Sequence, residues 1–163
     1  MGCGTLENMF HKNSHSDPIY RLAIKAREEV RQLVRTKQGQ IEAYEDTLAC
    51  ACAVGTYVLI AALKRHGIKA KLIMGIAYDC IEMDVVANHC WAQLLDGTIV
   101  DITATQFKQP IWKVFFRCDD PNYESVYEGK RAVAQLKHWP EGQNPLRSRD
   151  ALLPAIKQIT LED

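Results

Sequence analysis

The pattern of apolar and polar residues predicts an amphipathic helix near the start of the chain. Residues 1–15 are polar and are expected to be disordered. Asp17-Pro18 then supplies a capping side chain and a proline suited to the first helical position. Apolar residues recur every three or four positions from Ile19 to Val34, and Gly39 is suited to stop the helix, so we expect a helix that ends near Thr36. The charged residues between them are expected on a solvated face: Arg21, Lys25, Arg27, Glu28, Glu29, Arg31 and Arg35.

A second segment, residues 49–63, is apolar on almost every side and predicts a buried, central helix. A basic last turn ending in His66 follows it, and Gly67 is suited to end the helix. His66 is therefore interpreted as a helix-terminal residue rather than a catalyst. Thr47 offers an alternative, earlier start because its side chain can act as an N-terminal cap.

Two further segments have the pattern of β-strands. Residues 70–78 (AKLIMGIAY) predict one strand. Residues 89–103 alternate apolar and polar side chains, break at Asp96-Gly97 and resume, which is typical of a β-hairpin. A two-residue turn at that break would bring positions near residue 92 opposite Asp101.

The C-terminal part of the chain has weaker patterns. Residues 111–117 predict another strand, and residues 123–138 are expected to be helical in part. Asp150 is suited to cap a short final helix that contains Pro154 near its start. Helices and strands in this order predict one α+β domain over residues 16–163.

The composition is that of an ordinary globular protein. Of the 163 residues 47% are apolar and 25% charged, and 20 basic residues balance 20 acidic ones. Neutral overall charge argues against nucleic acid or an anionic membrane as a partner, and no apolar run is long enough to span a bilayer. The first residues lack a basic segment followed by an apolar one, so we expect a cytoplasmic protein or an effector delivered by other machinery. The sequence does not specify an oligomeric state.

The six cysteines are expected to be reduced thiols, because a chain of this size needs no disulfide cross-links. Cys50-x-Cys52 and the adjacent pair His89-Cys90 are poor spacings for tetrahedral zinc, so we expect no metal and no cofactor. Cys50 and Cys52 lie where the apolar helix begins, and a helix N-terminus lowers the pKa of a thiol. Either cysteine fits a nucleophile, and both also fit small core residues.

His89 opens the first strand of the predicted hairpin and Asp101 ends the second. The two residues are expected to lie one diagonal apart, within hydrogen-bonding reach. Asp101 has apolar neighbours and needs a buried partner, for which an imidazole N–H is well suited. Cysteine, histidine and aspartate in this order supply the groups that nucleophilic attack on an amide requires. The alternative for His89 is a purely structural role.

These residues resemble the transglutaminase-like branch of the papain-like cysteine hydrolases. Three features carry the resemblance: Cys52, fifteen residues before the glycine that ends its helix; the run GIKAKLIMG at residues 67–75; and His-x-Trp at His89, followed after a turn by Asp101. The run DITATQF that starts at Asp101 resembles a segment of uncharacterised bacterial members. Together these features cover residues 48–107.

The resemblance implies a papain-like α+β fold, in which a central helix bearing the cysteine packs on a small antiparallel sheet. It selects Cys52 over Cys50, and it implies a Cys52-His89-Asp101 triad that transfers acyl groups through a thioester. The chain departs from members that have a Gly-x-Cys turn before the nucleophile. It also lacks an evident side chain for the oxyanion hole, for which Gln40 and Tyr44 are candidates.

We therefore expect a thiol enzyme that cleaves or transfers an amide acyl group of a protein or peptide. Glutamine deamidation, transamidation, and peptide or isopeptide cleavage all fit this expectation, and bacterial members with toxin or effector roles extend it by analogy. The alternatives are a non-catalytic interaction domain that retains the fold and a zinc module.

Overall fold

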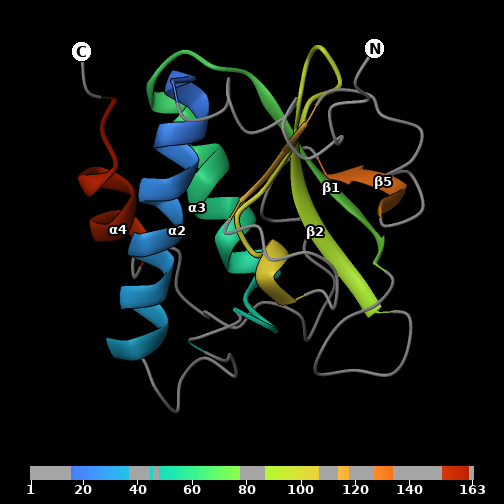
Figure 1. The fold of residues 1–163 in the computed structure, drawn as a ribbon, viewed down its shortest axis with the longest axis horizontal. Helices are drawn as coiled ribbons and strands as arrows, with labels where there is room; N and C mark the ends of the chain where they lie inside the picture. The colour runs from blue at the N-terminus through green and yellow to red at the C-terminus, as the bar shows by residue number, and fades with distance from the viewer. Residues whose placement is uncertain are drawn as a thin grey trace, which may run out of the picture.

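Helices lie on one side of an antiparallel sheet in the structure (Figure 1). A computed structural model of the chain describes residues 16–36, 45, 48–77, 87–106, 114–117, 127–133 and 152–161. The five strands follow the order β4-β3-β2-β1-β5. The expected α+β class is confirmed. The elements are α2 (Pro18–Thr36), α3 (Cys52–Arg65), β1 (Ala70–Ala77), β2 (Ala87–Leu94), β3 (Ile99–Asp101), the 3-10 helix η1 (Ala104–Gln106), β4 (Phe115–Arg117), β5 (Tyr127–Val133) and α4 (Leu153–Gln158).

The amphipathic helix is confirmed as α2, with the predicted start. The Asp17 side chain accepts a hydrogen bond from the backbone N–H of Ile19 at 2.7 Å, which satisfies one of the first free amides of the helix. For one residue of this face, the prediction of a solvated position is wrong. Arg27 is buried, with 6% of its surface exposed, because it faces the segment that follows β3.

The apolar helix is confirmed as α3, but it begins at Cys52, three residues later than predicted. Leu48 and Cys50 have positive φ angles of 55° and 64°, which are left-handed conformations that a helix cannot include. Ala51 occupies the N-cap position and makes no side-chain capping bond there. The alternative cap, Thr47, lies outside the described residues.

The predicted end of α3 is confirmed. His66 occupies the C-cap position, and Gly67 follows with a φ of 74°, which glycine adopts without strain. The predicted role of His66 as a helix-terminal residue therefore agrees with its place in the fold.

The strand at residues 70–78 is confirmed as β1, and β2 and β3 form the predicted hairpin, although its loop differs. The backbone N–H of Leu94 donates to the Thr98 carbonyl at 2.9 Å, and the N–H of Gly97 donates to the Leu94 carbonyl at 3.1 Å. Residues 95–97 therefore form a three-residue loop rather than a two-residue turn. Gly97 has a φ of 92°, as expected for the left-handed last residue of such a loop.

Compared with the predicted two-residue turn, this loop shifts the pairing of β2 with β3 by one residue. Ala92 pairs with Val100, so Asp101 follows opposite Trp91 instead of residue 92. Since side chains alternate between the faces of a strand, the shift puts Asp101 on the face of Trp91 and His89. The register implied by the two-residue turn would have put Asp101 on the opposite face, away from His89.

The strand predicted over residues 111–117 is confirmed in part, and two other predictions for the C-terminal part are corrected. Of residues 111–117, the described strand β4 covers only Phe115–Arg117. Within residues 123–138, the described part is the strand β5 and not a helix, because it pairs with β1. The final helix α4 has Leu152 at its N-cap with no side-chain capping bond, and Asp150 lies outside the described residues.

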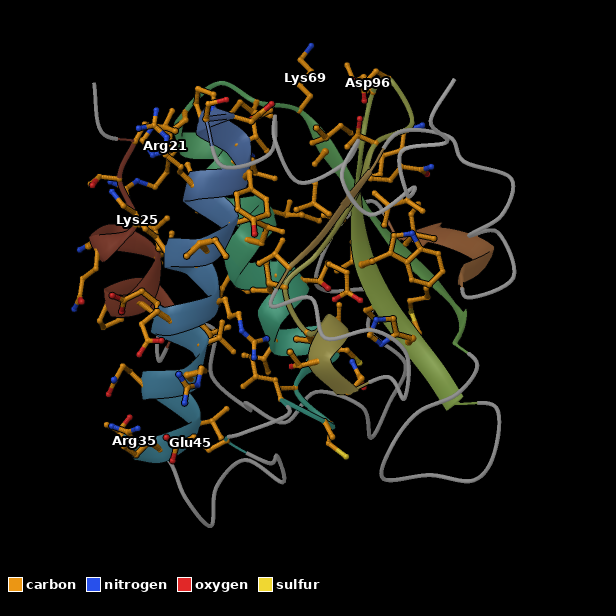
Figure 2. The ribbon with its side chains drawn as sticks, in the orientation of Figure 1. Arg21, Lys25, Arg35, Glu45, Lys69 and Asp96 are labelled. Atoms are coloured by element: carbon orange, nitrogen blue, oxygen red, sulfur yellow. The ribbon has the colours of Figure 1, made fainter. Side chains whose placement is uncertain are left out.

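The core lies between the helices and the sheet, with α3 contacting β1, β2, α2 and α4. In Figure 2, side chains fill this layer, while Lys69 and Asp96 mark one end of the molecule and Arg35 and Glu45 the other. The fully buried apolar residues include Val30, Val58, Leu59, Leu63, Val100 and Ile102. None of the helices in the described ranges has the length and hydropathy to cross a membrane.

Candidate active site

The structure brings together three sequence-predicted side chains, from α3, β2 and β3. His89 Nε2 lies 2.7 Å from Asp101 Oδ2, and each side chain is only 1% exposed. Because a carboxylate can only accept, Nε2–H donates and the other ring nitrogen, Nδ1, points elsewhere. Cys52, the first residue of α3, hydrogen-bonds to His89. Cys52 rather than Cys50 is thus the cysteine in contact with the histidine.

The second carboxylate oxygen of Asp101 is held by Thr103. Its Oδ1 accepts from the Thr103 backbone N–H and from the Thr103 hydroxyl, both at 2.8 Å. Burial alone would raise the pKa of Asp101, but the His89 charge and these hydrogen bonds outweigh it and lower the pKa. Asp101 is therefore a fixed, ionised acceptor for the imidazole.

Cys52 has the electrostatic surroundings of a reactive thiol. The pKa of Cys52 is well below that of an ordinary thiol, chiefly because the Cys90 side chain hydrogen-bonds to its sulfur. Burial opposes this shift, while hydrogen bonding to His89 and the charge of His89 add to it. The start of α3 contributes in the same direction, because the unpaired amides of a first helical turn favour negative charge.

His89 is charged although it is buried. Burial by itself would lower its pKa, but the charge and the hydrogen bond of Asp101, together with Cys52, raise the pKa to about 10. Trp91 stacks on the imidazole, with 6.0 Å between ring centroids and 25° between planes. Both shifts favour a thiolate beside an imidazolium, the two forms that attack a carbonyl carbon and deliver a proton.

Gln106 contacts the site and was not predicted. Its Nε2 donates to the Thr103 carbonyl at 2.9 Å and to the Thr103 hydroxyl at 3.0 Å, and it lies 3.3 Å from His89 Nδ1. The bond to a carbonyl fixes the amide orientation, so the nitrogen of the amide and not its oxygen faces the imidazole. The only sequence signal for Gln106 was its place in the run DITATQF.

Two residues of α3 beyond Cys52 set how closely the helix approaches the strands. A Cβ atom on Gly55 would lie 3.0 Å from Thr103 Cγ2, so only glycine fits here without a shift. The Thr56 hydroxyl donates to the Cys90 carbonyl at 3.0 Å, which ties α3 to β2 one turn after Cys52. These contacts hold Cys52 against the hairpin.

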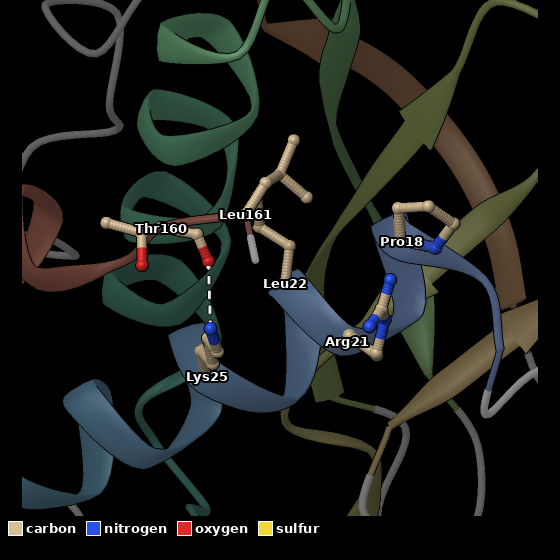
Figure 3. Close-up of a pocket in the computed structure, with 6 residues that line it drawn as sticks. All are labelled: Pro18, Arg21, Leu22, Lys25, Thr160 and Leu161. Atoms are coloured by element: carbon tan, nitrogen blue, oxygen red, sulfur yellow. Dashed lines mark hydrogen bonds between the residues drawn. The ribbon is translucent and has the colours of Figure 1, made fainter. Parts of the chain in front are cut away.

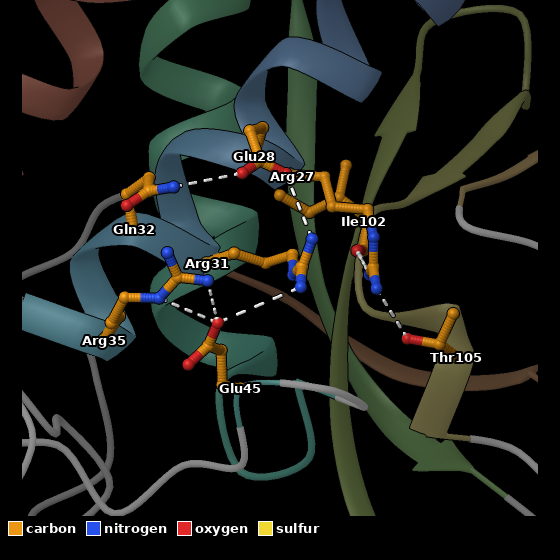
Figure 4. Close-up of polar contacts among 8 residues, drawn as sticks. All are labelled: Arg27, Glu28, Arg31, Gln32, Arg35, Glu45, Ile102 and Thr105. Carbon is orange, nitrogen blue, oxygen red and sulfur yellow. Dashed lines mark hydrogen bonds and ion pairs between the residues drawn. The ribbon is translucent and has the colours of Figure 1, made fainter.

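Arg27, on α2, hydrogen-bonds to the segment that follows Asp101 (Figure 4). Its guanidinium donates to the Ile102 carbonyl and, at 2.9 Å, to the Thr105 hydroxyl. The neighbouring Arg31 and Arg35 point instead to Glu45 near the surface. Arg27 was missed by sequence reasoning because the helical pattern treats every charged residue as solvated.

The remaining site predictions are placed as follows. Cys50 is exposed and precedes the helix. Gln40 and Tyr44 lie outside the described residues. No cluster of three histidine, cysteine or acidic side chains that could hold a metal occurs within the part of the chain that the structure describes. Cys50, Cys52 and Cys90 are not in disulfides.

A surface pocket lies elsewhere, between α2 and the segment after α4 (Figure 3). It is lined by Pro18, Arg21, Leu22, Lys25, Thr160 and Leu161. Lys25 Nζ donates across it to the Thr160 carbonyl at 3.1 Å. This bond ties α2 to the C-terminal segment.

Compared with protein-family models, with curated proteins and with solved structures, the chain matches none of them.

Proposed function

We propose that this chain is a cysteine hydrolase or acyltransferase with a transglutaminase-like, papain-like fold. One observation carries the proposal: the buried 2.7 Å contact between His89 and Asp101, on a histidine that also contacts the thiol at the start of α3. Cys52, His89 and Asp101 then have the roles of nucleophile, general acid–base and orienting carboxylate.

The proposed reaction begins with the Cys52 thiolate, which attacks the carbonyl carbon of an amide and forms a C–S bond. His89 donates its Nδ1 proton to the amide nitrogen as the C–N bond breaks, which leaves a thioester and a neutral imidazole. Water or an amine then attacks the thioester while His89 takes its proton. The C–S bond breaks and the thiolate and imidazolium are restored.

Backbone amides at the start of α3 are suited to stabilise the negative oxygen of the tetrahedral intermediate. The first N–H groups of a helix have no intrahelical acceptor and point towards a group bound at its N-terminus. The Cys52 N–H is the nearest such donor to the attacking sulfur.

The proposed substrate is an amide of a protein or peptide, such as a glutamine side chain, a peptide bond or an isopeptide bond. Hydrolysis and transamidation share every step up to the arrival of the acceptor, so the acceptor decides between them. We place the reaction in the cytoplasm, where a reducing environment keeps a nucleophilic thiol active.

The first test needs no substrate. The intact chain is treated with iodoacetamide near neutral pH, and alkylation is followed at each cysteine by mass spectrometry. Cys52 is expected to react on the order of tenfold or more faster than Cys50, because the thiolate is the reacting form. Equal rates at the two positions would contradict an activated Cys52.

The second test identifies the reaction. Candidate proteins are incubated with the wild-type chain, with Cys52→Ala and with the matched control Cys50→Ala, then analysed by mass spectrometry. The expected products are deamidated, cleaved or cross-linked proteins, formed by the wild type and the control but not by Cys52→Ala. Products that persist with Cys52→Ala and vanish with Cys50→Ala would show that the other cysteine is the nucleophile.

A further inference from the structure

Cys90 lies against the nucleophile but has no role in the proposed amide chemistry. It is 4% exposed and packs with Ala53 and Leu72 in a small apolar cluster that Cys52 joins from its partly buried position. The Cys90 thiol also hydrogen-bonds to the Cys52 sulfur. Two cysteine side chains packed together are a chemical feature distinct from the proposed triad.

The backbone of Cys90 is held on both sides. The Thr56 hydroxyl donates to the Cys90 carbonyl at 3.0 Å, and Thr56 lies one helical turn after Cys52. On the other side, Cys90 pairs with Met74 in the register of β1 and β2. The two cysteines therefore meet through a fixed helix–strand contact.

The two thiols are chemically unequal. The hydrogen bond from Cys90 lowers the pKa of Cys52, and the same interaction, followed by burial, raises the pKa of Cys90. Cys52 is thus the thiolate and Cys90 the protonated thiol. A peroxide reacts with a thiolate, whereas a neighbouring thiol can condense with the sulfenic acid that forms.

We propose that Cys52 and Cys90 form a reversible disulfide when the chain meets a hydroperoxide. The Cys52 thiolate attacks the terminal peroxide oxygen, the O–O bond breaks, and an alkoxide or hydroxide leaves and is protonated, so Cys52 becomes a sulfenic acid. The Cys90 sulfur then attacks the Cys52 sulfur, the S–O bond breaks, and water leaves with the Cys90 proton.

This disulfide has two consequences at the site. It occupies the sulfur that would attack an amide, so the proposed enzyme is switched off while oxidised. It also prevents further oxidation of Cys52 to the sulfinic acid, which thiol reductants do not reverse. The inference goes beyond the proposed function and needs only the two thiols, so it stands even for a chain without amide substrates.

The experiment uses the reduced full-length chain and hydrogen peroxide. After treatment, remaining thiols are alkylated and the chain is digested without reductant. The expected product is one cross-linked species that joins the Cys52 peptide to the Cys90 peptide, with two hydrogens lost. Dithiothreitol should restore iodoacetamide labelling at Cys52. A cross-link from Cys52 to Cys50 or to any other cysteine would overturn the proposal, and so would sulfinic acid as the main wild-type product.

Three variants separate chemistry from structure. Cys90→Ser keeps a hydrogen-bond donor but cannot form the disulfide, and Cys90→Ala removes both. Both are expected to accumulate irreversibly oxidised Cys52, and Cys50→Ser should retain the Cys52–Cys90 cross-link. Thermal unfolding by circular dichroism establishes that each variant is folded. Folded Cys90 variants that remain as fully reversible as the wild type would overturn the proposal.

Discussion

At the scale of single residues, His89 lies between two groups that raise its pKa, Asp101 and Cys52, and this position links the pKa of His89 to that of Cys52. His89 faces Asp101 through Nε2 and also hydrogen-bonds to Cys52, so each neighbour favours the charged form of the imidazole. The fixed amide of Gln106 near Nδ1 favours the neutral ring instead. The protonation state of His89 therefore depends on residues that lie on three different elements.

The thiolate should persist well below the usual pKa of a thiol. Because the pKa of Cys52 is lowered, its alkylation rate should stay near its plateau at about pH 7, where an ordinary cysteine has largely lost its anion. His89→Ala should move the midpoint of this pH profile upward, since the imidazolium is removed. Rates of iodoacetamide labelling across pH measure both profiles, and superimposable curves for the two chains would contradict the ion pair.

The raised pKa of His89 also predicts loss of turnover in alkaline solution. The pKa of His89 is raised to about 10, so the imidazolium that protonates the leaving nitrogen is present below that pH and is lost as pH rises through it. Once a substrate is known, the alkaline limb of kcat/KM against pH locates this step.

Asp101→Asn should reduce turnover on the order of a hundredfold or more, because an amide at this position no longer holds the productive tautomer of the imidazole. Stability gives an independent readout. The folded-state pKa of Asp101 is lowered, so its stabilising contribution is present above about pH 4 and is lost as pH falls through the folded value. In urea unfolding, the difference between the wild type and Asp101→Asn should therefore shrink in acid. A difference that grows in acid would contradict this assignment.

At the scale of elements, the register of β2 and β3 decides which way Asp101 points. Val100 and Ile102 flank Asp101 and are buried in the main core, so their packing directs the carboxylate to the other face. Exposed Leu95 belongs to the loop and not to a strand pair. The apolar neighbours of Asp101 thus specify its direction, and a slip of one residue would expose both of them.

The close approach of α3 to the segment that follows β3 gives a prediction at Gly55. In Gly55→Ala the new Cβ meets Thr103 Cγ2, and Thr103 cannot turn aside without breaking its bonds to Asp101. The carboxylate should shift, and turnover should fall on the order of tenfold or more, because small displacements of reacting groups are costly.

Gly67→Ala is the matched control for this prediction. Nothing lies within 4 Å of its new Cβ, but the φ of 74° strains any side chain. Gly67→Ala should therefore lose about 1–2 kcal/mol of unfolding free energy while keeping wild-type turnover. Turnover measured beside urea unfolding distinguishes the two variants, and a Gly67→Ala chain that is folded but inactive would contradict the explanation.

Local patterns predicted much of the fold and the meeting of Cys52, His89 and Asp101, and non-local contacts account for what they missed. The capped start of α2, the end of α3 at Gly67 and the hairpin each depend on neighbouring residues, so the sequence displays them. The strand β5 depends on pairing with β1, far away in the chain, and its own residues do not reveal that partner. The left-handed φ angles of Leu48 and Cys50, which delay the start of α3, have no signal in those residue types, since neither favours that region.

At the scale of the whole molecule, α2 belongs to the site through Arg27, although it carries none of the triad. Arg27→Met should leave the Ile102 carbonyl and the Thr105 hydroxyl without their donor, which costs about 1–3 kcal/mol of unfolding free energy. Turnover should fall as well, because the segment that positions Thr103 loosens. Urea unfolding and turnover measure the two effects.

Arg35→Gln is the control for Arg27→Met. The Arg35 side chain pairs with Glu45 in an exposed position, so its replacement should change neither the unfolding free energy nor turnover noticeably. Equal losses in the two variants would show that Arg27 acts only as one more surface charge.

The buried guanidinium of Arg27 also balances the electric charge of the site. Arg27 is within electrostatic range of Asp101, so the resting site combines two positive groups, Arg27 and His89, with two negative ones, Asp101 and Cys52. In the proposed thioester state Cys52 and His89 are both neutral, and Arg27 still offsets Asp101. These four described groups therefore sum to zero net charge before and after the proposed acylation, so neither state carries the solvation penalty that an uncompensated buried ion would impose.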